Sequence, residues 1–131
     1  MAVILLSPNC KKRSKIDKFP TINHCVIEIS NIPENCLNNA DLVKFLDLLC
    51  INEDLHIVEK FHHVFEPHGF SLVYILKESH IAMHSWPNRS YLHIDLVTCS
   101  LKETDLDSLN NFITKYFKDE KTNVEITKLL Y

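Results

Sequence analysis

Two amphipathic helical segments, set among extended runs, place the strongest constraint on the fold of this chain. The first begins near Ala40, and its apolar residues recur with the spacing of one helix face: Leu42, Phe45, Leu46 and Leu49. The second follows Thr104, and its apolar face is formed by Leu106, Leu109, Phe112, Ile113, Tyr116 and Phe117. A helix with one apolar stripe must bury that stripe against another element. Both segments therefore predict a sheet for the helices to cover, with Asn39 and Thr104 as their N-caps.

Extended runs rich in β-branched residues supply such a sheet. They are expected at 24–29, 56–65, 70–77, 91–99 and 122–130, with 78–86 continuing in extended conformation. Strict alternation from Tyr91 to Cys99 places Cys99 on the opposite face from Leu92 and Leu96. The sequence therefore predicts the α+β class: a two-layer α/β sandwich in the order β-α-β-β-β-α-β, with an antiparallel-rich sheet covered by two helices.

Length and charge bound the organisation of the chain. With 131 residues, of which 46% are hydrophobic, a single domain is expected over residues 21–131. Residues 1–20 are expected to form a basic N-terminal extension that carries Lys11, Lys12, Arg13, Lys15 and Lys18. A net charge of −3 gives no general attraction to nucleic acid or to anionic membranes. The apolar stretch 2–6 is too short to span a bilayer.

Cysteine, glycine and histidine usage excludes several kinds of site. The five cysteines include no C-x-x-C pair, which argues against a disulfide framework or a zinc knuckle. Gly69 is the single glycine, so the chain has neither a glycine-rich phosphate loop nor a dinucleotide fingerprint. The eight histidines lack metal-binding spacing. We therefore expect a cytoplasmic protein with no metal, no nucleic-acid partner and no membrane partner.

Three residues could carry chemistry. Ser79, His84 and Cys99 supply a hydroxyl, an imidazole and a thiol, which together could form a nucleophilic or acid–base site. By residue type alone the indication is weak. His84 could equally be a polar residue at a sheet surface, and Cys99 a small buried side chain.

Four short stretches at fixed separations carry a more specific indication. They are FEPHGFS at 65–71, ESHI at 78–81, HSWP at 84–87 and DLVTC at 95–99. This pattern resembles the self-cleavage motif of the small, prokaryotic-type S-adenosylmethionine decarboxylase proenzymes, which depend on a pyruvoyl group. The resemblance is strongest over residues 62–99 and looser elsewhere.

The resemblance implies that the chain cuts itself between Glu78 and Ser79 into β and α chains. Ser79 would attack the Glu78 carbonyl in an N-to-O acyl shift and end as a pyruvoyl group, so that no pyridoxal phosphate and no metal is needed. His84 and Ser71 match the family residues that assist this processing. Alternation along the run from Phe70 to Ser79 would place Ser71 and Ser79 on the same face of the sheet.

For turnover, the resemblance implies a decarboxylase. The substrate amine would form a Schiff base with the pyruvoyl group, Cys99 would donate the proton that completes the product, and Phe65 would stack against the adenine ring of S-adenosylmethionine. The product would be decarboxylated S-adenosylmethionine, the aminopropyl donor for spermidine in polyamine biosynthesis. Family members commonly form homodimers whose active sites lie near the interface.

Some positions depart from the family pattern. Asn88 stands where glutamate is usual, Ser100 where glycine is usual, and 30–33 replaces a usual tyrosine-glycine turn. None of these changes touches Ser79, His84 or Cys99, so they bear on the substrate more than on self-processing. Two alternatives therefore remain open: a pyruvoyl-dependent arginine or ornithine decarboxylase, and a non-processing relative that acts as a binding or regulatory partner.

Overall fold

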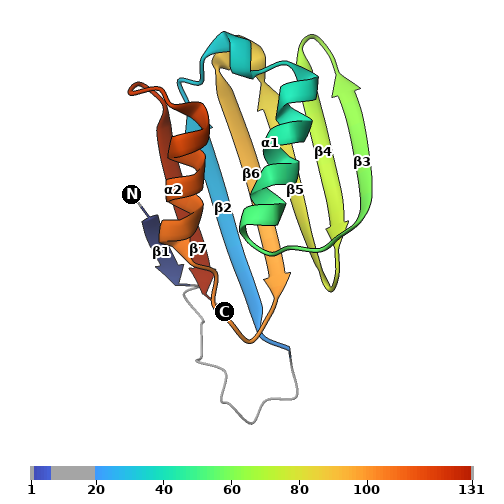
Figure 1. The fold of residues 1–131 in the computed structure, drawn as a ribbon, viewed down its shortest axis with the longest axis vertical. Helices are drawn as coiled ribbons and strands as arrows, with labels where there is room; N and C mark the ends of the chain where they lie inside the picture. The colour runs from blue at the N-terminus through green and yellow to red at the C-terminus, as the bar shows by residue number, and fades with distance from the viewer. Residues whose placement is uncertain (1, 7–19, 131) are drawn as a thin grey trace.

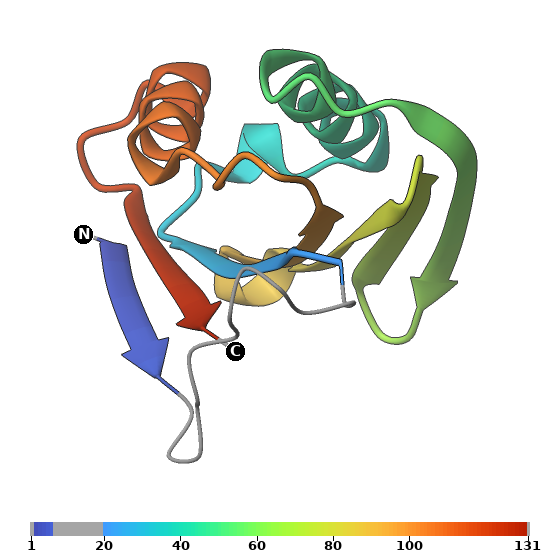
Figure 2. The same cartoon turned by 90° about the horizontal axis from the view of Figure 1, so that it is seen from below.

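The structure is a computed structural model that describes residues 2–6 and 20–130. Within these residues, two helices lie on the same face of one seven-stranded sheet, as Figures 1 and 2 show. The elements are β1 Ala2–Leu6, β2 Ile22–Ser30, α1 Asn39–Asn52, β3 Ile57–Phe65, β4 Gly69–Leu76, β5 Ser79–Trp86, β6 Tyr91–Cys99, α2 Leu106–Phe117 and β7 Asn123–Leu130, with short 3₁₀ turns at Glu34–Cys36 and Pro87–Arg89. The predicted two-layer α/β sandwich is confirmed.

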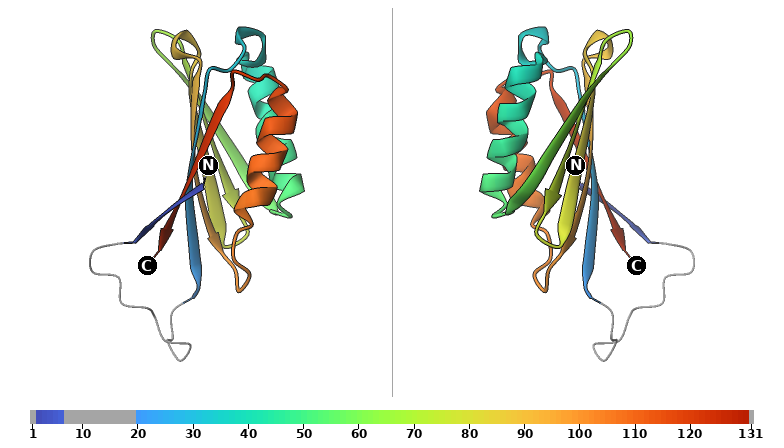
Figure 3. Two further views of the ribbon diagram at one scale, coloured as in Figure 1. Left: turned by 90° about the vertical axis from the view of Figure 1, so that its left-hand side faces the viewer. Right: turned by 90° about the vertical axis from the view of Figure 1, so that its right-hand side faces the viewer.

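The strands follow the spatial order β1-β7-β2-β6-β5-β4-β3. The pairs from β7 to β3 are antiparallel, and β1 lies parallel to β7 at one edge. Both helices cover the central strands from one side (Figure 3). We call the opposite side of the sheet, which neither helix covers, the open face.

The helix layer follows the predicted apolar stripes. All four predicted α1 residues are fully buried: Leu42, Phe45, Leu46 and Leu49. On α2, Leu109, Ile113 and Phe117 are buried. The ring of Phe45 links the two helices, because it lies 6.0 Å from the Phe112 ring and 5.0 Å from the Tyr116 ring, measured between centroids.

The residue that caps each helix lies one position away from the predicted cap. Asn38, not Asn39, caps α1 by accepting a hydrogen bond from the Asp41 backbone N–H. Asp105, not Thr104, caps α2 by accepting one from the Ser108 backbone N–H. In both helices the capping side chain reaches the N–H of the third residue that follows it, which is the usual N-cap geometry.

The burial of β6 confirms the predicted alternation. Leu92, Ile94 and Leu96 are buried beneath the helices, whereas Cys99 and the other odd-numbered residues of β6 are half-buried and lie on the open face.

Two strands are added to the predicted element order. Ala2–Leu6 forms β1, whose residues pair in register with Ile126 to Leu130 of β7. Residues 7–19, which carry the basic cluster of the predicted extension, lie outside the described part of the chain. The second addition is β5, because the run that was expected to continue through 78–86 instead turns sharply at Lys77 and Glu78.

This turn corrects the predicted placement of two serines. Because β4 and β5 form an antiparallel hairpin, Ser79 lies opposite Leu76 and faces the helix side with it. Leu76 is buried, whereas Ser71 lies on the open face among the alternating exposed positions of β4. The prediction that Ser71 and Ser79 share a face was therefore wrong, since it treated two strands as one.

Candidate active site

The predicted scissile bond lies at the tip of the β4–β5 hairpin. Only Lys77 and Glu78 connect Leu76 to Ser79. Glu78 has φ 59°, in the left-handed region that residues with a Cβ avoid at a cost of about 1–2 kcal/mol. The backbone is therefore strained at the residue whose carbonyl Ser79 would attack.

The hydroxyl of Ser79 is held in place beside this strained residue. Its Oγ accepts a hydrogen bond of 3.0 Å from the backbone N–H of Cys99. This bond ties the first residue of β5 to the last residue of β6. The contact joins Ser79 to the backbone of Cys99, whereas the Cys99 thiol lies with the other odd-numbered residues of β6.

A cavity of about 470 Å³ adjoins Ser79 on the helix side of the sheet. Leu55, Leu76 and Leu96 supply apolar walls, and the chain from 98 to 105 forms another side. Desolvation by burial raises the pKa of Glu53 on its rim. The turn that holds the predicted scissile bond therefore borders a partly enclosed space and not open solvent.

Ser71 and His84 form a second pair on the open face. They lie directly opposite each other on β4 and β5, and Ser71 Oγ is 2.7 Å from His84 Nδ1. Burial lowers the pKa of His84, and the charge of His93 lowers it further. His84 therefore stays neutral over a wider pH range than a free imidazole and can accept a proton.

Within one chain the two pairs are separate. Ser79 and His84 are five residues apart on β5, which corresponds to about 16 Å along a strand. They also lie on opposite faces, because Ser79 shares the helix side with Ile81 whereas His84 belongs to the open face. The structure brings Ser79 to Cys99 and Ser71 to His84, but it does not bring these two pairs together.

Phe65 belongs to a half-buried aromatic group that extends from His84. Its ring meets Trp86 edge-on with 6.0 Å between centroids, and Trp86 lies 5.5 Å from Tyr91 and 6.2 Å from His84. The ring of Phe65 also explains Gly69, because a Cβ at Gly69 would overlap it. The sequence predicted no role for Trp86 or Tyr91, because their contacts with Phe65 and with each other depend on strand register.

Comparison with known proteins decides the family. A family model described as S-adenosylmethionine decarboxylase matches residues 23–128. The chain belongs to the S-adenosylmethionine decarboxylase family. The family resemblance inferred from the four motifs is confirmed, and with it the assignment to an enzyme family of decarboxylases.

Several members of the family are similar over most of their length. An S-adenosylmethionine decarboxylase proenzyme of Clostridium botulinum (strain Hall) is 40% identical over 78 residues, which cover 59% of this chain and 67% of the relative. The proenzyme of Acetivibrio thermocellus is 33% identical over 96 residues, covering 72% of this chain and 77% of the relative. The crystal structure of the adenosylmethionine decarboxylase from Aquifex aeolicus shares the fold, with a TM-score of 0.65 and 17% identity over 86% of this chain and 92% of that one.

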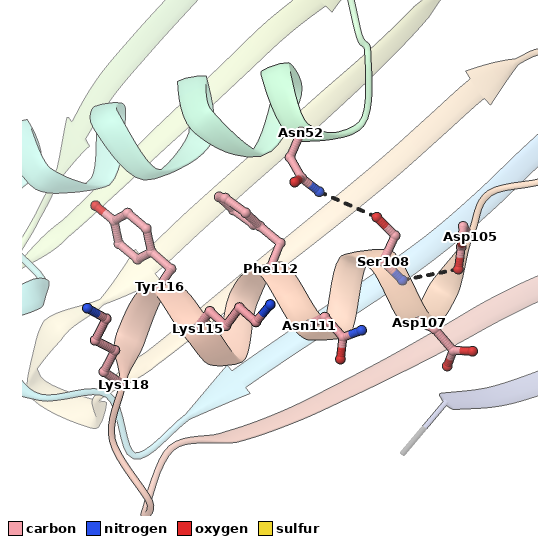
Figure 4. Close-up of a pocket in the computed structure, with 9 residues that line it drawn as sticks. All are labelled: Asn52, Asp105, Asp107, Ser108, Asn111, Phe112, Lys115, Tyr116 and Lys118. Carbon is pink, nitrogen blue, oxygen red and sulfur yellow. Dashed lines mark hydrogen bonds between the residues drawn. The ribbon is translucent and has the colours of Figure 1, made fainter.

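A second hollow lies away from the predicted site residues. A shallow groove of about 730 Å³ runs along α2 and shares only Asp105 with the cavity at Ser79 (Figure 4). In the part of the chain that the structure describes, no three His, Cys, Asp or Glu residues are grouped so as to hold a metal ion. No helix among the same residues is long and apolar enough to cross a membrane.

Proposed function

We propose that this chain is a self-processing, pyruvoyl-dependent decarboxylase that converts S-adenosylmethionine to decarboxylated S-adenosylmethionine, the aminopropyl donor for spermidine synthesis. The observation that carries the proposal is the placement of Ser79 directly after a residue strained at φ 59°, with its hydroxyl held by a hydrogen bond. Relatives named as proenzymes support it, because such a name denotes a precursor that must be processed.

Processing would begin at Ser79. Its Oγ attacks the carbonyl carbon of Glu78, a C–O bond forms, the amide C–N bond breaks, and the hydroxyl proton passes to the freed nitrogen. Strain at Glu78 favours this step, because breaking the peptide releases its backbone from the left-handed region. His84 is the proposed base of the later elimination, and Ser71 orients its ring through the 2.7 Å contact at Nδ1.

The residues present fit a pyruvoyl group derived from Ser79. Ser79 is half-buried beside a cavity of about 470 Å³, which leaves room for a substrate next to the new group. A pyruvoyl group supplies an electron sink for the electron pair left by departing CO2. Cys99, which also lines this cavity, would deliver a proton to the product carbon. Phe65 lies with Trp86 and His84 and not with Ser79, so it would stack on the adenine ring from a second copy. No metal and no pyridoxal phosphate is required by this scheme.

A homodimer would complete the site. The Ser71–His84 pair is too far from Ser79 to act within one chain. A second copy packed on the open face could supply it by reaching around the turn at the end of β5, because Ser79 itself faces the helix side. Apolar side chains are exposed on that face: Phe61 at 54%, Val73 at 36% and Ile75 at 43%. Large side chains of this kind favour association over solvation. We therefore propose that each site combines Ser79 and Cys99 of one copy with Ser71 and His84 of the other.

A basic amino acid is the alternative substrate. Asn88 lies exposed in the turn after β5, where the family usually carries glutamate, and the loss of this carboxylate would fit a change of substrate. Arginine and ornithine decarboxylation would use the same pyruvoyl chemistry.

We assign the decarboxylase activity to residues 21–131. We propose that the protein acts in the cytoplasm, because the four cysteines among the described residues are free thiols.

The decisive experiment is an intact mass spectrum of the purified, denatured protein, with turnover measured on the same sample. We expect two fragments that divide between Glu78 and Ser79, the second blocked at its N-terminus, and release of CO2 from S-adenosylmethionine. Release from arginine or ornithine alone would move the substrate to the alternative. Ser79→Ala is the control and should remain one inactive chain. A single full-length mass for the unaltered protein after long incubation would indicate a non-processing relative and contradict the proposal.

A further inference from the structure

A row of polar side chains crosses the open face at the height of His84. Its members lie directly opposite one another on four neighbouring strands: Ser71 on β4, His84 on β5, His93 on β6 and Glu28 on β2. Directly opposed residues of antiparallel strands have Cβ atoms about 4.5–5.5 Å apart. Each member of the row is therefore an immediate neighbour of the next.

His93 has no part in the processing scheme given above, yet it is the titratable neighbour that faces His84 across the sheet. After desolvation, the charge of His93 is the second cause that lowers the pKa of His84. On its other side His93 faces Glu28, whose carboxylate accepts a hydrogen bond of 3.1 Å from the Tyr91 hydroxyl. His93 thus lies between the proposed base and an anchored carboxylate.

We propose that His93 is a positioning residue for self-cleavage, which acts through His84 by opposing a positive charge on that imidazole. Two adjacent imidazoles do not both become charged without mutual repulsion. A positive charge at position 93 therefore disfavours a positive charge on His84 and favours the neutral imidazole that can act as a base. The cleavage role rests on the proposed function, whereas the coupling between the two histidines does not.

Among the titratable groups around His84 and His93, His93 is the one that lies directly opposite His84. On β4, Ser71 is flanked by Gly69 and Val73, which carry no charge. Along β6, Asp95 shares the face with His93, but its Oδ1 lies 2.6 Å from Nε2 of His24. Two further titratable residues lie just beyond the ends of the row: His63 is opposite Ser71, and Glu125 is opposite Glu28.

Two substitutions at position 93 separate electrostatics from structure. His93→Gln removes the titratable charge, and His93→Lys makes it permanent. We would titrate the ring signals of ¹⁵N-histidine by NMR in the uncleavable Ser79→Ala chain and assign His84 by its loss in His84→Gln. The His84 midpoint should move to higher pH in His93→Gln and to lower pH in His93→Lys. Structural damage would not give opposite signs, so equal midpoints in the two variants would overturn the coupling.

The matched control is His62→Gln. His62 is an exposed histidine on β3 that contacts Phe70 and lies outside the row, so its loss should leave the His84 midpoint in place. A shift as large in His62→Gln as in His93→Gln would overturn the assignment to His93.

Cleavage kinetics test the role itself. In the chain that retains Ser79, the acid limb of the cleavage rate should move in the same two directions. A limb that stays in place in both variants, while the unaltered chain cleaves, overturns this inference alone. Failure of the unaltered chain to cleave overturns the proposed function, and the cleavage role of His93 with it.

Discussion

Complementation between two inactive chains is the sharpest test of a site shared between copies. The perturbation is to combine a Ser79→Ala chain, which has nothing to cleave, with a His84→Ala chain, which lacks the proposed base. In a single chain these positions are about 16 Å apart along β5 and lie on opposite faces. Neither variant can repair itself. A mixed dimer, however, contains one site that lacks both groups and one site that is complete.

The expected yield follows from the symmetry of the dimer. Random pairing of equal amounts places about half of the His84→Ala chains in mixed dimers, because each chain meets either kind of partner with equal frequency. About half of these chains should therefore be cleaved, whereas the same chain alone should cleave slower by about the 10²–10⁴-fold that a positioned base contributes.

The assay is co-refolding of differently tagged chains, followed by intact mass spectrometry of the His84→Ala chain. The matched control replaces the helper by a Ser79→Ala/His84→Ala double variant, which pairs equally well but brings no imidazole. Cleavage that is no faster with the Ser79→Ala helper than with the double variant would refute the shared site. Full cleavage of His84→Ala on its own would remove His84 from the processing scheme.

Four further predictions concern Ser71, Ser85, Cys99 and the pH dependence of cleavage. Ser71→Ala removes the 2.7 Å contact with His84 and should slow cleavage about tenfold, as expected for a hydrogen bond of about 1–1.5 kcal/mol; an unchanged time course would contradict it. Ser85→Ala should raise the free energy of unfolding by about 1 kcal/mol in urea titrations, because the buried Ser85 Oγ has no hydrogen-bond partner among the described residues; lower stability would count against this. Cys99→Ala should still cleave but lose turnover and convert its pyruvoyl group to alanine, which mass spectrometry detects; full turnover would free Cys99 of its role. Because burial lowers the pKa of His84 from 6.5, its neutral form persists below that pH, so the cleavage rate should fall only below pH 6.5; a fall that begins above it would contradict the role of His84.

The elements that the sequence predicted well are those with an unambiguous period. The stripes of α1 and α2 and the alternation of β6 define which side chains must be buried, and the structure places them within a residue or two of the predicted bounds. Parallel pairing of β1 with β7 was not predictable in this way, because it joins residues 2–6 to residues 126–130 and leaves no periodic signal.

The β4–β5 turn was missed for a different reason. Lys77 and Glu78 are neither glycine, proline, asparagine nor aspartate, so nothing in the local sequence indicates a turn. The two paired strands force Glu78 into the left-handed region against its own preference. The error carried over to the site, since a continuous strand would have aligned Ser71 with Ser79.

For the candidate site, the sequence predicted which residues to consider but not which residues lie beside them. The motifs gave Ser79, His84, Cys99, Ser71 and Phe65 as candidates, because residue type and spacing are properties of the sequence. The neighbours of these residues depend on the register of strands that are distant along the chain. Trp86 beside Phe65 and His93 beside His84 therefore emerged only from the fold.

The strand order has a consequence for the chain once it is cut. Cleavage after Glu78 would assign β1, β2, β3 and β4 to one fragment and β5, β6 and β7 to the other. In the sheet, β2 lies between β6 and β7, so a strand of the first fragment is hydrogen-bonded on both sides to strands of the second. The fragments could separate only by breaking both ladders of β2 and also the ladders that join β1 to β7 and β4 to β5. If the chain is processed as proposed, its unfolding would become a dissociation of two chains, and the unfolding midpoint would depend on protein concentration.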